Sequence, residues 1–341
     1  MPANANAAST NRQLWFCLML MSLLVGLDGR SAHPERKPWN HSNFRGCYLP
    51  GEPPSSTIPS AILSSGESDV TGASSSIVVG YDGSPDAERA LDWAAAAATR
   101  RPGTAVHLTH ALGLPHLPFG PGERTVAEVL AEHEQEARRR LDQASGRLAS
   151  LGVPAEIHLR RWLPAETVLE HAAKIGAGLI AVGQHGHGPT RMLLGSVSGK
   201  IARAARAPVL VARGSAGAPS PRRILLALDG SPSSLAAAAA VARWASTAAV
   251  EAVTVEDGGL RPDLAALHAA LERVGLDPAR TELRVETGPV ASTLLDLAVT
   301  GGFDLVAAGR RGLSAWRELL TGGVSEKLLL LSPCPVLLAH A

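Results

Sequence analysis

The sequence has little cysteine, almost no net charge and only one long hydrophobic run. Its three cysteines, Cys17, Cys47 and Cys334, are scattered over 341 residues, which excludes a disulfide framework, a paired-cysteine zinc site and a CxxC redox motif. Lysine plus arginine (32) balances aspartate plus glutamate (31), so no basic field indicates nucleic acid or a membrane surface as a partner. The lack of a disulfide pattern fits a reducing compartment, and we expect a cytoplasmic protein of about two domains.

Residues 1–75 differ from the rest of the chain because they show no sustained helix or strand periodicity. They contain Pro53-Pro54 and several serine clusters, which is typical of disorder. The hydrophobic run, Leu14–Leu27, has fourteen residues, too few to cross a bilayer comfortably as a helix. Its length suits a signal peptide, with Arg12 as a thin positive flank. We interpret residues 1–75 as a disordered or non-native extension, with a signal or anchor at Leu14–Leu27 as the alternative.

Three landmarks occur twice in the same order along the rest of the chain. Each copy opens with an apolar run and Asp-Gly-Ser-Pro, continues to a second apolar run that ends in spaced glycines, and closes with an apolar run after proline. The matching pairs are Ile77–Pro85 with Ile224–Pro232, Leu179–Gly186 with Leu305–Gly312, and Pro208–Ala212 with Pro335–Ala339. A repeat of this kind indicates two copies of one domain. We place them at residues 76–213 and 222–341, with a linker of small residues and proline at 214–221.

Strand and helix patterns alternate within each copy, which predicts an α/β fold with a parallel sheet covered by helices on both faces. The second copy repeats the order of the first, but its middle helix, about 262–274, is about half as long as its counterpart. The first copy is expected to have strands at 77–81, 104–111, 155–159, 179–182 and 209–212, and helices after Ser84 and at 125–150, 165–174 and 196–206.

Both repeated motifs begin where an apolar strand ends. In the first copy Asp82 follows the first strand and Gly183 follows the fourth. Ligands of open α/β sheets bind beyond the carboxyl ends of the strands, near the point where the strand order reverses. If these two strands are neighbours, the two motifs face each other across one crevice.

The second motif has the composition of a phosphate cradle. Gly183 and Gly186 allow backbone conformations and close approaches that larger residues forbid. Gly195-Ser196 then opens a helix, where free N–H groups, the helix dipole and the serine hydroxyl favour an anion. Asp82 repels phosphate and suits a ribose hydroxyl or a bridging Mg²⁺ instead. In combination these residues predict a mononucleotide site in the first copy.

The same residues also have purely structural interpretations. Asp-Gly-Ser-Pro is a common turn and helix cap, and His185 with His187 has no third metal ligand nearby in the sequence. Trp93 and Trp244 lie on alanine-rich helices, and we expect them to pack in the core. The run Arg138–Arg140 predicts a solvated helix face.

At these residues the chain resembles the universal stress protein family, in its tandem form. The nucleotide signature of that family is a glycine, two residues, a second glycine, nine residues, and a third glycine followed by serine or threonine. The first copy matches with Gly183, Gly186 and Gly195-Ser196, but eight residues separate the second and third glycines. Its loop over the phosphates is therefore one residue shorter than the family pattern.

The second copy departs from the signature in another way. Gly309, Gly312 and Gly322 keep the family spacing, but Gly323 stands where the family has a hydroxyl. We therefore expect a weaker second site, at Asp229, Gly309, Gly312 and Gly322.

The resemblance implies a Rossmann-like parallel sheet of five strands, order 3-2-1-4-5, in each copy. It implies ATP or a related adenine nucleotide as ligand, possibly bound with Mg²⁺, with the ribose at Asp82 and the adenine near His110 and Ala111. Domains of the family pair through their last strands, so the two copies are expected to pair within the chain or in a homodimer. The phosphate-loop positions implied by the resemblance are Gly183, Gly186, Gly195 and Ser196, with Val197 just beyond. We also expect His185, between the first two glycines, to contact the nucleotide.

The resulting hypothesis is a nucleotide-binding stress-response regulator or sensor that is not an efficient enzyme. The chain has no GxxxxGK[ST] motif, and Asp82 and His185 are the only obvious general bases, so ATP hydrolysis is expected to be slow at most. One alternative is an interaction protein that binds no nucleotide and acts through dimerisation. A remote alternative is an ATP-consuming ligase, which needs a Ser-Gly-Gly-x-Asp-Ser loop that Asp82–Pro85 does not match.

Overall fold

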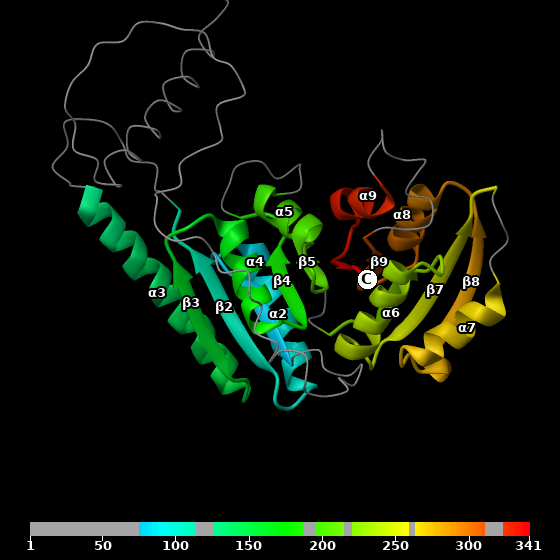
Figure 1. Cartoon of the computed structure of the whole chain (residues 1–341), viewed down its shortest axis with the longest axis horizontal. Coiled ribbons are helices and arrows are strands. Elements are labelled where there is room, and N and C mark those ends of the chain that lie inside the picture. Colours follow the sequence, from blue (N-terminus) through cyan, green and yellow to red (C-terminus); the bar gives the residue numbers. More distant parts are fainter. Residues whose placement is uncertain (1–74, 114–125, 187–194, 215–219, 259–262, 311–322) are drawn as a thin grey trace, which may run out of the picture. The chain divides into compact units, whose positions relative to one another are not determined.

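The described residues form one ten-stranded sheet with helices on both faces (Figure 1). Residues 1–74, on which the expectations of a disordered or non-native extension and of a signal or anchor at Leu14–Leu27 rest, lie outside the described residues. A computed structural model of the chain describes residues 75–113, 126–186, 195–214, 220–258, 263–310 and 323–341.

The expected elements of the first domain are found within two residues of their expected ends. Its strands are β1 (Ser76–Gly80), β2 (Ala105–Ala111), β3 (Ala155–Arg160), β4 (Leu179–Gly183) and β5 (Val209–Ala212). Its helices are α2 (Pro85–Thr99), α3 (Val126–Ser150), α4 (Pro164–Ile175) and α5 (Ser196–Ala204).

The second domain repeats this order of elements. Its strands are β6 (Arg223–Ala227), β7 (Ala249–Glu256), β8 (Thr281–Thr287), β9 (Leu305–Gly309) and β10 (Val336–Ala339). Its helices are α6 (Pro232–Trp244), α7 (Leu264–Arg273), a 3₁₀ helix (Pro278–Arg280), α8 (Val290–Thr300) and α9 (Val324–Leu331). The middle helix α7 has 10 residues against 25 in α3, which confirms the expected difference in length.

The order of the strands confirms the expected topology in both domains. The sheet runs β3-β2-β1-β4-β5-β10-β9-β6-β7-β8, which reads 3-2-1-4-5 from either edge to the centre. All pairs within a domain are parallel, while β5 and β10 pair antiparallel, with Leu210 opposite Leu337. The last strands of the two domains therefore pair within one chain and join two five-stranded sheets into one.

The buried side chains form two clusters, one on each face of the sheet. Strand residues alternate between the faces, so Ile77 and Val79 belong to one cluster and Val78 to the other. The first cluster contains residues of α2, α3, α6 and α7, and the second contains residues of α4, α5, α8 and α9. β1 and β4 are buried on both faces, as their continuous apolar runs predict.

The turn after β1 starts helix α2 by a mechanism that its sequence predicts. Gly83 has φ 78°, a conformation that favours glycine. The Ser84 hydroxyl then accepts a hydrogen bond from the N–H of Ala87, and Pro85 occupies the first helical position. Asp229-Gly-Ser-Pro repeats this turn before α6, with Ser231 as the cap. Asp82 is thereby placed at the carboxyl end of β1.

Trp244 packs at the contact between the two domains. Trp93 is 6% exposed and Trp244 5%, which confirms the expectation that both are packing residues. Trp244 Nε1 donates to the carbonyl of Gly178 at 3.1 Å, and the guanidinium of Arg101 lies 5.7 Å from its ring centroid. The α6 helix of the second domain is thus tied to the loop before β4 of the first.

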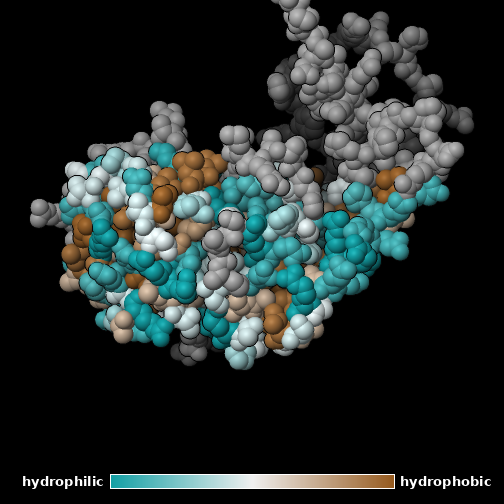
Figure 2. Space-filling model, turned by 180° about the vertical axis from the view of Figure 1, so that it is seen from behind, coloured by the Kyte–Doolittle hydropathy of each residue, from teal (hydrophilic) through white to brown (hydrophobic). Residues whose placement is uncertain are grey.

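On the face drawn in Figure 2, hydrophobic residues form small patches among hydrophilic ones, as is usual for a surface that faces water. Within the described part of the chain, no helix combines the length and the hydrophobicity that a membrane span requires.

Candidate functional site

A crevice of about 310 Å³ lies at the carboxyl ends of β1, β2 and β4. It occupies the place that the topology predicts, because β1 separates β2 from β4 and the strand order reverses there. Its volume is at the lower end of the range for small-molecule sites. The sequence-predicted residues that line it are Asp82, Ala111, Gly183, His185, Gly186, Gly195, Ser196 and Val197.

The three glycines of the first-domain motif allow segments of the chain to approach each other closely. A Cβ on Gly183 would lie 2.7 Å from the backbone N of Ala87, and one on Gly195 would lie 2.6 Å from the carbonyl oxygen of Gln184. A Cβ on Gly186 would lie 2.6 Å from Oδ2 of Asp82. None of the three has a positive φ, so the expectation of unusual backbone conformations at Gly183 and Gly186 is wrong. These glycines are needed for space.

Asp82 adopts the turn role that the sequence left open. Its Oδ1 accepts a hydrogen bond from the N–H of Ser84 at 2.9 Å, and Asp229 makes the same bond to Ser231. Such a bond from an aspartate to a backbone N–H two residues later shapes the local turn. Asp82 also lines the crevice, with Oδ2 next to Gly186, so the turn role does not use the whole carboxylate.

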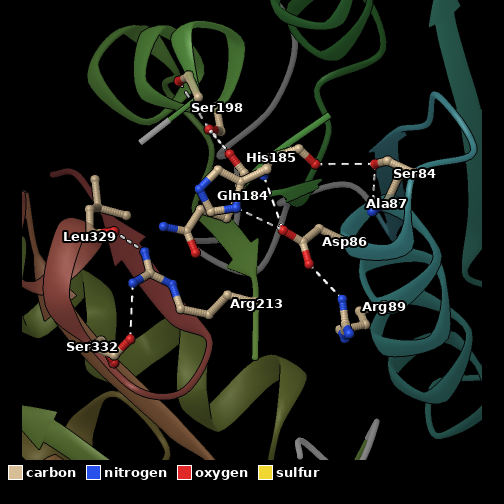
Figure 3. Close-up of polar contacts among 11 residues, drawn as sticks. Ser84, Asp86, Ala87, Arg89, Gln184, His185, Ser198, Arg213, Leu329 and Ser332 are labelled. Carbon is tan, nitrogen blue, oxygen red and sulfur yellow. Dashed lines mark hydrogen bonds and ion pairs between the residues drawn. The ribbon is translucent and has the colours of Figure 1, made fainter. Parts of the chain in front are cut away.

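Helix α2 holds the loop after β4 through Asp86 (Figure 3). Oδ2 of Asp86 accepts hydrogen bonds at 3.1 Å from both the backbone N–H and Nδ1 of His185. Ser84 Oγ donates to the His185 carbonyl at 3.1 Å, and Arg89 pairs with the other oxygen of Asp86 at 2.5 Å. The sequence reasoning missed Asp86, because its partner lies 99 residues away and no local pattern links them.

The start of α5 is fixed to the same loop. Gly195 is the N-cap residue, and Ser196 and Val197, which begin the helix, are exposed. Ser198 is buried and donates through Oγ to the carbonyl of Gln184 at 2.9 Å. The first backbone N–H groups of α5 have no partners inside the helix, which makes this end favourable for an anion.

At the end of β2, His110 and Ala111 line the crevice as the resemblance implies. His110 Nδ1 lies 2.6 Å from the carbonyl oxygen of Tyr81, and burial lowers the pKa of this imidazole. Tyr81 donates its hydroxyl to Glu88, and burial together with that carboxylate raises the pKa of the phenol. Thr109 is buried beside them, and its hydroxyl has no hydrogen-bond partner within the described structure.

Arg140 of α3 lies closer to the site than the sequence analysis expected. Arg138 and Arg139 are solvated, with side chains 61% and 58% exposed, as predicted. Arg140 is also partly exposed, but its Nη1 approaches the carbonyl of Asp82 at 3.4 Å. It lines a second cavity of about 130 Å³, which shares Asp82, Tyr81 and His110 with the main crevice. The solvated face predicted for Arg138–Arg140 is therefore wrong in part for Arg140, because its contact with Asp82 joins two elements and no local pattern links them.

The second domain repeats the walls of the site in part. A Cβ on Gly309 would lie 2.7 Å from the backbone of Ser233 and Ser234, as one on Gly183 would from α2. Ser325 Oγ donates to the Arg310 carbonyl, matching Ser198 in the first domain. Ser233 stands where the first domain has Asp86.

Gly312 and Gly322 lie outside the described residues, as does His187 of the HxH pair. The described residues contain no group of three ligands that could hold a metal.

Both domains of the chain match one protein family in sequence. The sequence profile of the universal stress protein family matches residues 74–213 and again residues 221–340. A universal stress protein of Mycolicibacterium smegmatis is 28% identical over 289 residues, which cover 77% of this chain and 96% of the relative. The universal stress protein YxiE of Bacillus subtilis is 33% identical over 148 residues, 40% of this chain and 97% of that protein.

A solved structure gives the same result for the fold. The universal stress protein from Archaeoglobus fulgidus superposes with a TM-score of 0.61 at 18% identity, over 78% of this chain and 98% of that one. The two profile matches cover both halves of the ten-stranded sheet, and each half has the expected strand order. The chain therefore belongs to the universal stress protein family, with two domains of that family in tandem.

Proposed function

We propose that the protein is a regulator or sensor in the stress response that binds ATP in its first domain. The observation that carries this proposal is the crevice at the strand ends, where Asp82, the close-packed glycine loop and the start of α5 meet. Two buried polar atoms of crevice residues, Thr109 Oγ1 and His185 Nε2, have no hydrogen-bond partner within the described structure. Buried polar atoms of this kind are uncommon and are often satisfied by a ligand or water.

The residues present fit an adenine nucleotide in one orientation. The Asp82 carboxylate would accept from the ribose hydroxyls, and the adenine would lie toward His110 and Ala111. The described lining residues include no lysine or arginine, so the phosphates would be held by backbone N–H groups and the dipole at Gly195-Ser196. Mg²⁺ would arrive with the ATP phosphates, and Asp82 is the lining carboxylate that could contact it.

The arrangement favours binding and regulation over rapid catalysis. Of the two possible bases, Asp82 is engaged in the turn, and His185 directs Nδ1 to Asp86 while its Nε2 is buried. A general base must come within hydrogen-bond reach of the proton that it removes. We therefore infer that ATP hydrolysis, if measured, is slow, and that the bound nucleotide acts by changing the state of the protein.

The proposal is tested by titrating the purified chain with ATP, with and without Mg²⁺, by calorimetry. Asp82→Ala should weaken ATP binding about tenfold, the equivalent of about 1.4 kcal/mol, because it removes acceptors for the ribose. The matched variant Asp229→Ala loses the same turn bond in the second domain and should leave the tight site unchanged. No ATP binding by the parent chain would refute the proposal and favour the interaction protein that binds no nucleotide.

A further inference from the structure

Helices α5 and α9 each end against an arginine of the other domain. Arg310, which follows β9, donates through Nη1 to the carbonyl of Ala205 at 2.7 Å, the C-cap residue of α5. Arg213, which follows β5, donates to the carbonyls of Ser332 and Leu329 at the end of α9 (Figure 3). The two contacts are alike in kind, but the arginines occupy different positions in their domains: Arg310 follows the fourth strand of the second domain and Arg213 the fifth strand of the first.

The physical basis of both contacts is the unsatisfied end of a helix. The last carbonyls of a helix have no partner within it and carry partial negative charge, so a cation that donates to them is favourable. Arg213 is 4% exposed, and burial lowers its pKa to about 10. Arg310 is half-buried, so its contact with Ala205 is shielded from water in part.

Arg310 is itself held firmly by the second domain. Its backbone N–H donates to the carbonyl of Ala339 in β10 at 2.8 Å, and its carbonyl accepts from Ser325 Oγ at 3.1 Å. The residue before it, Gly309, ends β9. The guanidinium therefore extends from a fixed backbone, and it can hold the end of α5 in place.

The opposite end of α5 is the proposed phosphate-binding end. The helix has only nine residues, with Gly195 as its N-cap and Ser198 bonded to Gln184 in the crevice loop. Because α5 has only about two and a half turns, we expect a change at Ala205 to be felt by the N–H groups at Ser196 and Val197. Phosphate binding by backbone donors depends on such positions, since hydrogen bonds weaken steeply with distance and angle.

We propose that Arg310 is a positioning residue for the nucleotide site of the first domain, supplied by the second domain. This inference rests on the proposed function, because it concerns the same site. It means that the first-domain site is complete only when the two domains are paired, and that Arg310 of the second domain affects affinity in the first.

The test uses the full chain and a readout specific to the first domain. Hydrogen exchange of the peptide covering residues 195–205, measured over a series of ATP concentrations, reports occupancy at the start of α5. Arg310→Ala should raise the ATP concentration needed for half-protection by about three- to tenfold. It should also speed exchange near Ala205 without ATP. Arg310→Lys, which can still donate to one carbonyl, should recover part of the loss.

Two controls separate positioning from general stability. Arg203→Ala removes a cation that belongs to α5 itself and lies 3.8 Å from Glu326 of α9 in the other domain. This variant should leave the protection of residues 195–205 by ATP unchanged. Val253→Ala, in the core of the second domain, should lower the thermal midpoint without changing the ATP concentration for half-protection. The inference is overturned if Arg310→Ala needs the same ATP concentration for half-protection as the parent chain. It is also overturned if Val253→Ala raises that concentration as much as Arg310→Ala does. A parent chain that shows no ATP protection would instead overturn the proposed function and this inference with it.

Discussion

At the scale of single residues, the two domains differ at the helix residue that lies against the glycine ending β4 or β9. In the first domain the Asp86 carboxylate binds both the backbone and the ring of His185. In the second domain the corresponding position is Ser233, whose shorter side chain carries no charge. Hydrogen bonds to a charged acceptor are about twice as strong as those between neutral groups. His185, two residues after β4, is therefore held in place without a ligand.

This difference gives a prediction for Asp86. Asp86→Ala should weaken ATP binding about tenfold, because His185 loses two hydrogen bonds that hold it in the crevice and the ligand must then fix its position. Asp86→Asn keeps one side-chain oxygen that can accept from the His185 N–H, so its loss should be smaller. Calorimetric titration of both variants measures this, with Ser233→Ala as the matched control in the second domain. Equal ATP affinities of Asp86→Ala and the parent chain would show that the hydrogen bonds from His185 to Asp86 have only a structural role.

Sequence reasoning found the residues of the site that belong to local patterns. Asp82 and the three glycines follow strands or precede a helix, so their place at the strand ends could be predicted. Asp86 and Arg140 could not be found in this way, because each acts on a partner in another element. Their roles depend on packing between α2, α3 and the loops, which no spacing in the sequence records.

At the scale of elements, helix α4 packs on β2 and β3 through three histidines. His171 of α4 lies with Nε2 3.4 Å from Nδ1 of His107 in β2, and its ring stacks on His158 of β3 at 4.1 Å. Glu156 of β3 lies 3.3 Å from His107. Burial, the two neighbouring histidines and Lys174 lower the pKa of His171 to about 4, and burial, Arg160 and Lys174 lower that of His158.

These pKa values predict loss of stability in acid. The folded protein binds fewer protons at His171 than the unfolded chain between about pH 6.5 and 4, so the free energy of unfolding falls as the pH falls through this range. Because the ring is partly exposed, we expect a loss on the order of 1 kcal/mol, below the full value of the shift.

Urea unfolding at pH 7 and pH 5 measures the effect. His171→Gln should lose less stability than the parent between these two values, whereas His268→Gln, which changes an exposed histidine of α7, should behave like the parent. An unchanged pH dependence in His171→Gln would show that other groups cause the acid sensitivity.

The elements themselves were the part of the fold that sequence reasoning predicted best. Buried parallel strands give continuous apolar runs, and Ser84-Pro85 marks a helix start, so β1, β4 and α2 could be placed closely. The antiparallel contact of β5 with β10 has no signal in either strand alone. It was expected only because the chain resembles a family whose domains pair in this way.

At the scale of the whole molecule, the pairing of β5 with β10 uses the last strand of both domains within one chain. A homodimer of this protein would therefore need a surface other than these two strands. The pairing also places the two proposed nucleotide sites in one continuous sheet, while the residues around them differ. A tandem chain of this kind can keep one domain for binding and use the other to support it.

We therefore predict that each chain has about one tight ATP site, in the first domain. In that domain Asp86 binds His185, a serine begins α5, and the long helix α3 brings Arg140 to Asp82. The second domain has Ser233 in place of Asp86, Gly323 in place of Ser196, and the shorter α7. The spacing of its glycines is closer to the family pattern, but a loop tolerates a changed length better than a phosphate site tolerates lost donors. One hydrogen bond to a charged group is worth about ten- to a hundredfold in affinity.

Calorimetry with paired variants measures which domain binds. Gly186→Val combined with Ser196→Ala should abolish the tight site, because any side chain at Gly186 meets Oδ2 of Asp82 within 2.6 Å and the α5 hydroxyl is lost. Gly312→Val, at the matching glycine of the second domain, should leave the tight site intact. Two equal sites per chain, or loss of binding from Gly312→Val alone, would mean that the second domain is the principal nucleotide site. The family spacing of its glycines would then contribute more to ATP affinity than Asp86 and the Ser196 hydroxyl of the first domain.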